Sequence, residues 1–223
     1  MERLGAILLY VLIGAVSMLL PMGIVAKSYR LRIYKLPLIV FLSSVIGLLS
    51  ASFWHFIENG RFDGISFFGC VFIMPLAAIA ESFVVREKMS DLLDEFSVCI
   101  CVMLAAMKIN CCMSGCCGGR DISLFGINYN FPSQQAEFIN AVILMAILLT
   151  LAISRKHRGK LYPLFMVLYG VTRFFLNFFR QEYDLYKGGF PPWGTVWSIV
   201  SIIIGIVWLS TIKKNSSKVQ ELT

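Results

Sequence analysis

Residues 161–184 read LYPLFMVLYGVTRFFLNFFRQEYD and carry both features on which the prediction of the fold depends. The first is an apolar block over about 161–180, close to the roughly 20 residues with which an α-helix crosses a bilayer. The second is Arg173, which lies well inside that block. A charge within a membrane span is costly, so a functional role is the first hypothesis for it. The stretch therefore predicts a transmembrane helix that carries part of a polar site.

Apolar blocks of this kind fill most of the chain. Hydrophobic residues make up 58% of its 223 residues, whereas soluble domains are about 45–50% apolar. We therefore predict an all-α polytopic membrane protein, with one transmembrane domain over residues 1–212 and a short polar tail over 213–223. The first block lacks a small-residue cleavage site, so we expect a span there and not a signal peptide. Seven transmembrane helices are expected, at about 5–26, 37–57, 64–85, 92–108, 138–154, 161–180 and 193–212.

The distribution of the cations predicts the orientation of these helices. The formal net charge is +7, and 13 of the 20 lysines and arginines lie in the segments that follow the first, third, fifth and seventh blocks. The positive-inside rule makes this side cytoplasmic. The N-terminus is then expected outside and the C-terminus in the cytoplasm, as an odd number of spans requires. This alternation argues for a membrane partner and against nucleic acid.

Three polar residues share one face of the sixth predicted helix. Arg173, Asn177 and Arg180 are spaced i, i+4 and i+7, which places them on one side of a helix. They rise about 10 Å towards the outer surface at 1.5 Å per residue. Position alone favours interfacial snorkelling for Arg180. The deeper Arg173 instead favours an anionic partner, a carboxylate or a phosphate.

Two neighbouring helices contribute further polar groups. Gln134 and Glu137 share a face near the outer end of the fifth helix, and Lys108 and Asn110 end the fourth, beside Arg120. Taken singly, Glu137 suits the positive N-terminal end of a helix, and a lysine at a helix end is typically an interfacial anchor.

Together these groups predict a binding site. They come from three helices, and the predicted topology places all of them in the outer half of the membrane. A cavity with three or four cations and one carboxylate would hold a phosphate headgroup. The residues alone thus indicate a protein that handles an anionic lipid or another anion, without specifying a reaction.

Four cysteines lie close together in residues 107–120, MKINCCMSGCCGGR. The pattern CCxxxCC is not a standard zinc spacing, and no histidine is near in sequence, so we predict no metal site. Gly115, Gly118 and Gly119 indicate a break in the helix. The cysteines are compatible with apolar packing, with a disulfide on the outer side, and with a redox or metal-handling role, and the pattern alone does not choose between these.

Five segments, in order over about residues 60–205, resemble the bacterial prolipoprotein diacylglyceryl transferases, which are membrane enzymes with seven helices and an external N-terminus. The first four are GISFFGCV (64–71), MKINCCMSGCCGGR (107–120), FPSQQAE (131–137) and YGVTRFFLNFFRQEYD (169–184), and WGTVWS (193–198) is a weaker match.

The chain also departs from the family pattern. Family histidines fall on Phe68 and Phe131, an arginine on Lys108, an asparagine on Cys111 and a glutamate on Asn177. Lysine does not reproduce the bidentate fork of arginine, and loss of both histidines removes the obvious base at neutral pH. The residues that match the pattern are Gly115, Gly119, Arg120, Pro132, Gln134, Glu137, Arg173 and Arg180.

The resemblance implies transfer of a diacylglyceryl group from phosphatidylglycerol, or a similar anionic phospholipid, to the lipobox cysteine of a preprolipoprotein in the bacterial cytoplasmic membrane, without a cofactor. Lys108 and Arg173 would hold the phosphate, and Glu137 is the remaining candidate base; these three are the expected catalytic residues. The expected substrate-binding residues are Asn110, Gly119, Arg120, Gln134, Asn177 and Arg180.

In that reaction the nucleophilic thiol belongs to the substrate, so the chain's own cysteines need no catalytic role. Two alternatives remain open from the sequence. The first is a non-catalytic or repurposed relative that binds lipid or peptide. The second is a thiol-redox or metal-handling membrane protein.

Overall fold

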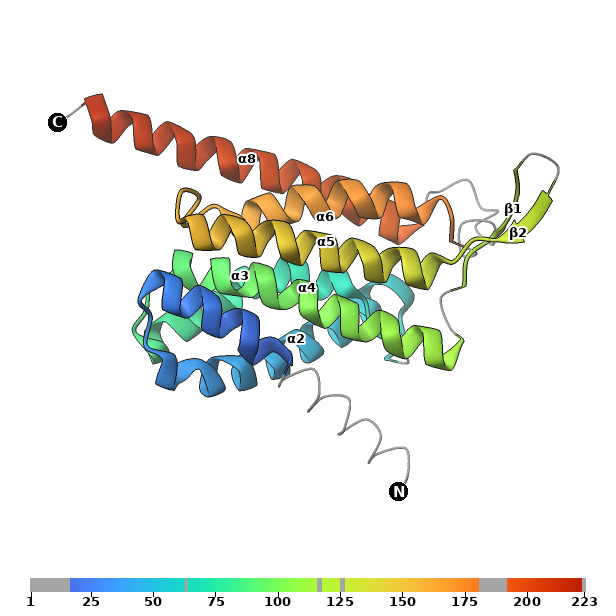
Figure 1. Cartoon of the computed structure of the whole chain (residues 1–223), viewed down its shortest axis with the longest axis horizontal. Coiled ribbons are helices and arrows are strands. Elements are labelled where there is room, and N and C mark those ends of the chain that lie inside the picture. Colours follow the sequence, from blue (N-terminus) through green and yellow to red (C-terminus); the bar gives the residue numbers. More distant parts are fainter. Residues whose placement is uncertain (1–16, 63, 116–117, 125–126, 181–191, 222–223) are drawn as a thin grey trace, which may run out of the picture.

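The computed structural model describes residues 17–62, 64–115, 118–124, 127–180 and 192–221. These ranges hold a bundle of seven α-helices and a two-stranded hairpin that projects from one end of it (Figure 1). The elements are a helix over 17–29, the short 3-10 helix η1 (Ile33–Lys35), α2 (Leu36–Asn59), α3 (Phe67–Val85), α4 (Met89–Ser114), β1 (Asp121–Leu124), β2 (Ile127–Asn130), α5 (Ser133–Ser154), α6 (Leu161–Asn177) and α8 (Trp193–Glu221).

Five of these helical segments are long and apolar enough to cross a membrane: Ile33–Asn59, Phe67–Val85, Met89–Met113, Ser133–Ser154 and Trp193–Lys214. The sixth, α6, is equally apolar in character but has only 17 residues. The chain is thus a polytopic, almost entirely helical membrane protein, as predicted. Of the first predicted span, 5–26, residues 5–16 lie outside the described ranges, and the remainder is helical.

The prediction for α6 was wrong at its C-terminal end. The helix was expected to continue to Arg180, but it ends at Asn177. The backbone N–H groups of Phe178, Phe179 and Arg180 each donate to the carbonyl three residues earlier, at 3.1–3.2 Å. This tighter spacing ends the α-helix, so Arg180 lies beyond the helix on which it was predicted.

The segment after α4 differs from the prediction in another way. The helix was expected to end near residue 108, but it continues to Ser114 and ends where Gly115 adopts a φ of 68°. A glycine accepts this left-handed conformation without steric strain, so the predicted glycine break is confirmed. The following hairpin, β1 paired with β2 in antiparallel register, was not predicted, because strands of four residues in a polar loop carry little periodic signal. At the other end of the chain, α8 continues through the polar tail to Glu221.

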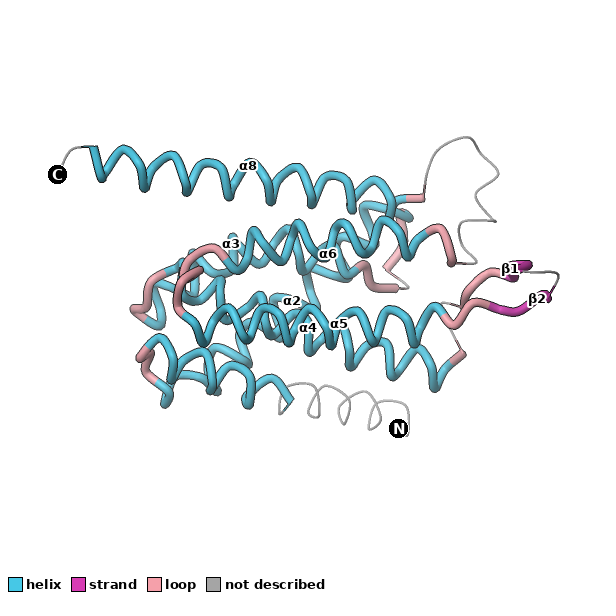
Figure 2. Tube along the Cα trace, turned by 45° about the horizontal axis from the view of Figure 1, so that its top comes forward, coloured by secondary structure: helices cyan, strands magenta, loops and turns pink. Residues whose placement is uncertain are grey.

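Small residues allow α6 and α8 to pack closely along their length (Figure 2). A Cβ atom added at Gly170 would lie 2.8 Å from the Ser198 carbonyl oxygen, and one at Gly205 would lie 2.8 Å from the Pro163 carbonyl oxygen. Close backbone approach at glycine is a common way to join helices within a membrane. This packing fixes the position of α6, which carries the candidate site residue Arg173.

At the end of the bundle away from the hairpin, Asp94 connects three helices. Its carboxylate accepts hydrogen bonds from the Tyr29 hydroxyl at 2.9 Å, the Leu161 backbone N–H at 2.9 Å and the Gly159 backbone N–H at 2.5 Å. The Leu161 N–H belongs to the first turn of α6, which has no acceptor within its own helix. Asp94 of α4 therefore determines where α6 begins.

The loop before α6 is held by a second contact. Arg158 donates two hydrogen bonds to the Asp91 carboxylate, both at 2.7 Å. This bidentate arrangement is among the stronger charge-assisted contacts, and the hydrogen bonds to Asp91 raise the pKa of Arg158 above its ordinary value.

We predict that Asp94→Ala lowers the free energy of unfolding by about 3 kcal/mol, because three donors lose their acceptor in a buried place. Thermal unfolding of the detergent-solubilised protein measures the change. Lys88→Ala, an exposed position at the start of the same helix, is the control and should stay within about 0.5 kcal/mol of the wild type. An equally small effect of Asp94→Ala would contradict the role of Asp94 in fixing α6.

Candidate functional site

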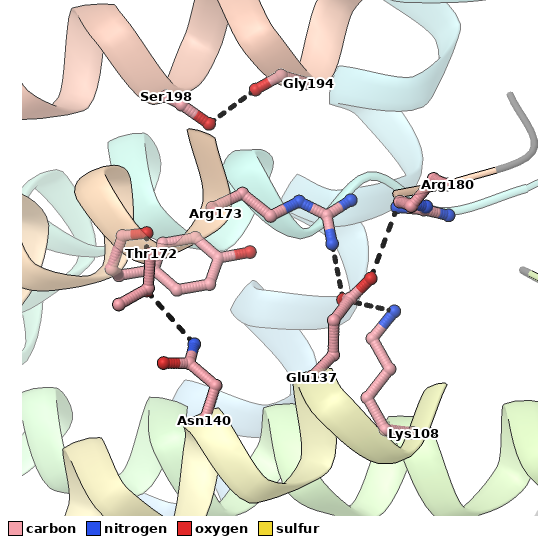
Figure 3. A network of polar contacts seen from close by, with 9 residues as sticks. Lys108, Glu137, Asn140, Thr172, Arg173, Arg180, Gly194 and Ser198 are labelled. Carbon is pink, nitrogen blue, oxygen red and sulfur yellow. Dashed lines mark hydrogen bonds and ion pairs between the residues drawn. The ribbon is translucent and has the colours of Figure 1, made fainter. Parts of the chain in front are cut away.

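Four charged side chains meet at the hairpin end of the bundle (Figure 3). The Glu137 carboxylate lies at their centre: its Oε2 is 2.7 Å from the Lys108 Nζ and also forms an ion pair with Arg173. The second oxygen, Oε1, is 3.7 Å from a guanidinium nitrogen of Arg180. We call these four residues the Glu137 cluster. It joins α4, α5 and α6 with the segment that follows α6.

The cluster is almost completely shielded from the surroundings of the protein. The exposed fractions of the side chains are 3% for Glu137, 7% for Lys108, 8% for Arg180 and 12% for Arg173. Buried charges persist in proteins only where they are paired. Within the cluster, three cationic side chains surround one carboxylate, which gathers several charge-assisted donors in one buried place.

Arg180 reaches the cluster because three segments converge on Gly119. Gly119 forms an isolated antiparallel bridge with Arg180. The Arg120 N–H donates to the Phe179 carbonyl, and the Phe131 N–H donates to the Arg120 carbonyl, both at 3.0 Å. A Cβ atom at Gly119 would lie only 1.8 Å from the Phe131 carbonyl oxygen. Only glycine allows this approach, which joins the exit of α4, the hairpin and the end of α6.

We predict that Gly119→Ala separates these segments and lowers the free energy of unfolding by about 1–3 kcal/mol, the usual effect of an inserted methyl group that has no room. Limited proteolysis of the hairpin and thermal unfolding check this. Gly23→Ala serves as the control, because an added Cβ there meets no atom within 4 Å. Unchanged proteolysis of the Gly119→Ala hairpin would argue against the convergence.

The remaining predicted site residues are arranged around the cluster. Asn177 is buried at the end of α6 beside α8, where a Cβ at Gly194 would lie 3.1 Å from its Nδ2. Arg120 is half-buried and adjoins the cluster through its backbone bond to Phe179. Asn110 is exposed near the end of α4, and Gln134 is half-buried in the first turn of α5. Asn110 and Gln134 thus lie outside the ion-pair cluster.

An apolar cleft of about 370 Å³ opens between α2, α3, α6 and α8. Three tryptophans contribute to its lining: Trp54, Trp197 and Trp208. Met166, which also lines it, precedes Arg173 by two turns of α6, or about 10 Å at 1.5 Å per residue. The cleft therefore lies deeper in the bundle than the Glu137 cluster, along the same helix.

Sequence reasoning missed a polar group at the C-terminal end of α2. The Ser66 hydroxyl donates to Glu58 Oε1 at 2.9 Å, and Asn59 Nδ2 lies 3.1 Å from His55 Nδ1. Ser66 is the N-cap residue of α3, whose Phe67 contacts Tyr169 with ring centroids 5.3 Å apart. Tyr169 precedes Arg173 by one turn of α6, so α3 connects this group to the helix that carries Arg173. The signal in the sequence was the spacing of His55 and Glu58 at i, i+3 in an otherwise apolar span.

The cysteines are distributed over two environments. Cys70, Cys99 and Cys101 are buried in the bundle, where the thiol of Cys70 donates to the Gly47 carbonyl at 3.1 Å. Cys111 and Cys112 lie in the last turn of α4, half-buried and exposed respectively, while Cys116 and Cys117 lie outside the described residues. Within the described ranges, no group of three or more His, Cys, Asp or Glu side chains is placed to hold a metal ion.

Comparison with known proteins agrees with the resemblance seen in the motifs. The sequence model of one family, described as prolipoprotein diacylglyceryl transferase, matches residues 4–211. The chain belongs to the prolipoprotein diacylglyceryl transferase family. This match covers nearly the whole chain and includes all four residues of the Glu137 cluster.

Two relatives of this family are similar over shorter ranges. A phosphatidylglycerol–prolipoprotein diacylglyceryl transferase of Francisella tularensis subsp. tularensis (strain FSC 198) is 38% identical over 96 residues, which are 40% of this chain and 36% of the relative. One from subsp. novicida (strain U112) is 39% identical over 83 residues, 35% of this chain and 31% of the relative. The alignments thus span about a third of the length of these relatives.

The resemblance places the two family histidines on Phe68 and Phe131, and both side chains pack against other rings. Phe68 is 3% exposed and packs against Phe72 and Tyr169, with ring centroids 5.9 and 5.7 Å apart. Phe131 stacks on Phe179 at 4.6 Å. Both positions have become part of apolar packing, and neither side chain can accept a proton.

Proposed function

We propose that this chain is a divergent phosphatidylglycerol–prolipoprotein diacylglyceryl transferase of the bacterial cytoplasmic membrane. Its substrates are phosphatidylglycerol, or a similar anionic phospholipid, and a preprolipoprotein with a lipobox cysteine. The proposal includes seven transmembrane helices, an external N-terminus and a cytoplasmic C-terminus. The convergence of Lys108, Arg173 and Arg180 on Glu137 carries the proposal, because such a cationic site inside a membrane protein requires an anion.

In this reaction the sulfur of the substrate cysteine attacks the glyceryl carbon of the lipid, and the carbon–oxygen bond to phosphate breaks. Negative charge develops on the departing glycerol phosphate. Arg173 presents the two-pronged donor that suits a phosphate, and Lys108 adds a second positive charge. Both act most strongly in a site shielded from water. Asn110, Gly119, Arg120, Gln134, Asn177 and Arg180 form the surrounding wall of the substrate site.

We assign Glu137 a positioning role. Its carboxylate contacts Lys108, Arg173 and Arg180 and so sets the distances among the three cations. A proton on Glu137 would remove the negative charge that lies among these three cations, which makes this carboxylate a poor base. The nearby apolar cleft suits an acyl chain of the lipid, since Met166 and Arg173 lie about 10 Å apart on α6.

A second function is favoured by one observation. The resemblance places both family histidines on Phe68 and Phe131, whose rings pack against other aromatic side chains, so a relative that binds the lipid or peptide without turnover is the alternative. Binding without chemistry and catalysis with another base make opposite predictions for product formation.

Complementation tests the proposal. The chain is expressed in a bacterium depleted of its own diacylglyceryl transferase, and the mass of a reporter prolipoprotein is followed. In parallel, the purified protein is mixed with phosphatidylglycerol vesicles and a lipobox peptide, and the release of glycerol phosphate is measured. We expect lipidated reporter and equimolar glycerol phosphate. Folded protein in the membrane that yields neither product, yet retains phosphatidylglycerol, would favour the binding alternative.

A further inference from the structure

Transfer to a thiol requires a group that takes the proton, because the thiolate and not the thiol is the nucleophile. The side chains of Phe68 and Phe131 cannot accept a proton, and Glu137 already forms ion pairs with three cations. If the proposed function holds, on which this inference rests, another side chain near Arg173 must accept the proton.

A carboxylate lies beside the position of the first lost histidine. Glu58, at the end of α2, accepts a hydrogen bond from Ser66, which is the N-cap residue of α3. Ser66 precedes Phe68 by two residues. The carboxylate is thus held at the entrance of the helix on which the family carries its histidine.

The surroundings of Glu58 leave it able to take a proton. It is half-buried, and among the described residues it forms no ion pair within 4 Å, in contrast to Glu137. The first turn of α3, which Ser66 caps, contacts α6 through Tyr169, one turn before Arg173. A carboxylate that has a neutral hydroxyl as its hydrogen-bond partner keeps lone pairs for a substrate proton.

We propose that Glu58 is the general base of this transferase. Its carboxylate takes the proton of the lipobox thiol, the resulting thiolate forms the carbon–sulfur bond, and the electron pair of the broken carbon–oxygen bond leaves on glycerol phosphate. Glycerol phosphate or water then receives the proton from Glu58. The reaction requires no oxidant, metal or further reactant.

The test compares Glu58→Gln with the wild type in the purified assay, with phosphatidylglycerol vesicles and a lipobox peptide, between pH 7 and 9.5. A thiol has an ordinary pKa of about 8.5, so at high pH the peptide supplies thiolate without a base. We expect the variant to be about 100-fold slower at pH 7. The deficit should shrink to below about 10-fold at pH 9.5, as the fraction of thiolate increases.

Two further variants test whether the effect is specific to the Glu58 carboxylate. Ser66→Ala keeps the carboxylate and removes the hydrogen bond that positions it, so we expect a decrease of about 10-fold at pH 7 that shrinks towards pH 9.5, as in Glu58→Gln. Glu87→Gln, the same chemical change at the opposite end of the bundle, should leave the rate unchanged. Retention of phosphatidylglycerol by each variant shows that it is folded, and Ser66→Ala carries the test if Glu58→Gln does not fold.

Three results would overturn the inference. The first is a normal rate for both Glu58→Gln and Ser66→Ala. The second is a deficit in folded Glu58→Gln that is the same at every pH, since this indicates a structural role. The third is a pH-rescued deficit in His55→Gln with normal Glu58→Gln, which would assign the base to His55. Absence of turnover by the wild type would instead overturn the proposed function, and this inference with it.

Discussion

Replacement of Arg173 by alanine is expected to abolish measurable lipidation while the protein remains folded. One preorganised donor to developing negative charge is typically worth about 10²–10³ in rate, and Arg173 combines a full charge with two donor nitrogens. Folding should survive, because Glu137 keeps Lys108 at 2.7 Å and Arg180 at 3.7 Å. Arg173→Lys keeps the charge without the planar fork and should retain an intermediate rate.

The rate of glycerol phosphate release and the mass of the reporter lipoprotein measure this effect, and thermal unfolding reports on the fold. Arg155→Ala is the matched control, since Arg155 is exposed at the opposite end of the bundle. Folded Arg173→Ala protein that lipidates the reporter at the wild-type rate would be incompatible with phosphate binding by Arg173.

Replacement of Glu137 by alanine is expected to have the largest effect on stability, a decrease of about 3–5 kcal/mol in the free energy of unfolding. The reason is the imbalance of the cluster. The variant leaves three buried cations without the carboxylate that lies among them. Mutual repulsion of like charges then adds to the unfavourable burial of each.

Thermal unfolding in detergent and the yield of folded protein measure this decrease. Gln135→Ala, an exposed position in the same helical turn, should change stability by less than about 0.5 kcal/mol. The double variant Glu137→Ala/Lys108→Met should recover part of the loss, because it removes one of the cations. If the double variant were less stable than Glu137→Ala alone, the electrostatic explanation would fail.

The two experiments separate binding from structure within one cluster. Arg173 can be removed because the remaining charges still compensate Glu137, whereas Glu137 cannot be removed because it is the shared partner. A loss of activity in Arg173→Ala and a loss of folded protein in Glu137→Ala are therefore different phenotypes.

Much of the fold follows from the sequence, because the requirement for an apolar helix of sufficient length is local. Predicted spans such as 37–57 and 193–212 correspond within a few residues to the apolar helical segments Ile33–Asn59 and Trp193–Lys214. The glycine break after α4 was likewise predictable, because glycine adopts the left-handed backbone conformation seen at residue 115 without steric strain. Arg173, a charged residue inside an apolar block, indicated the candidate site from the sequence alone.

Tertiary structure decided which polar residues meet. Arg180 was assigned to the same helical face as Arg173, yet it leaves α6 and reaches Glu137 through the contact at Gly119. Glu58 was not singled out, because its relation to Arg173 depends on how α2 and α6 are each placed against α3. Hydropathy and helical period are properties of residues that are close in sequence. An ion pair between helices depends instead on the rotation and separation of those helices. Side-chain packing between distant segments determines both.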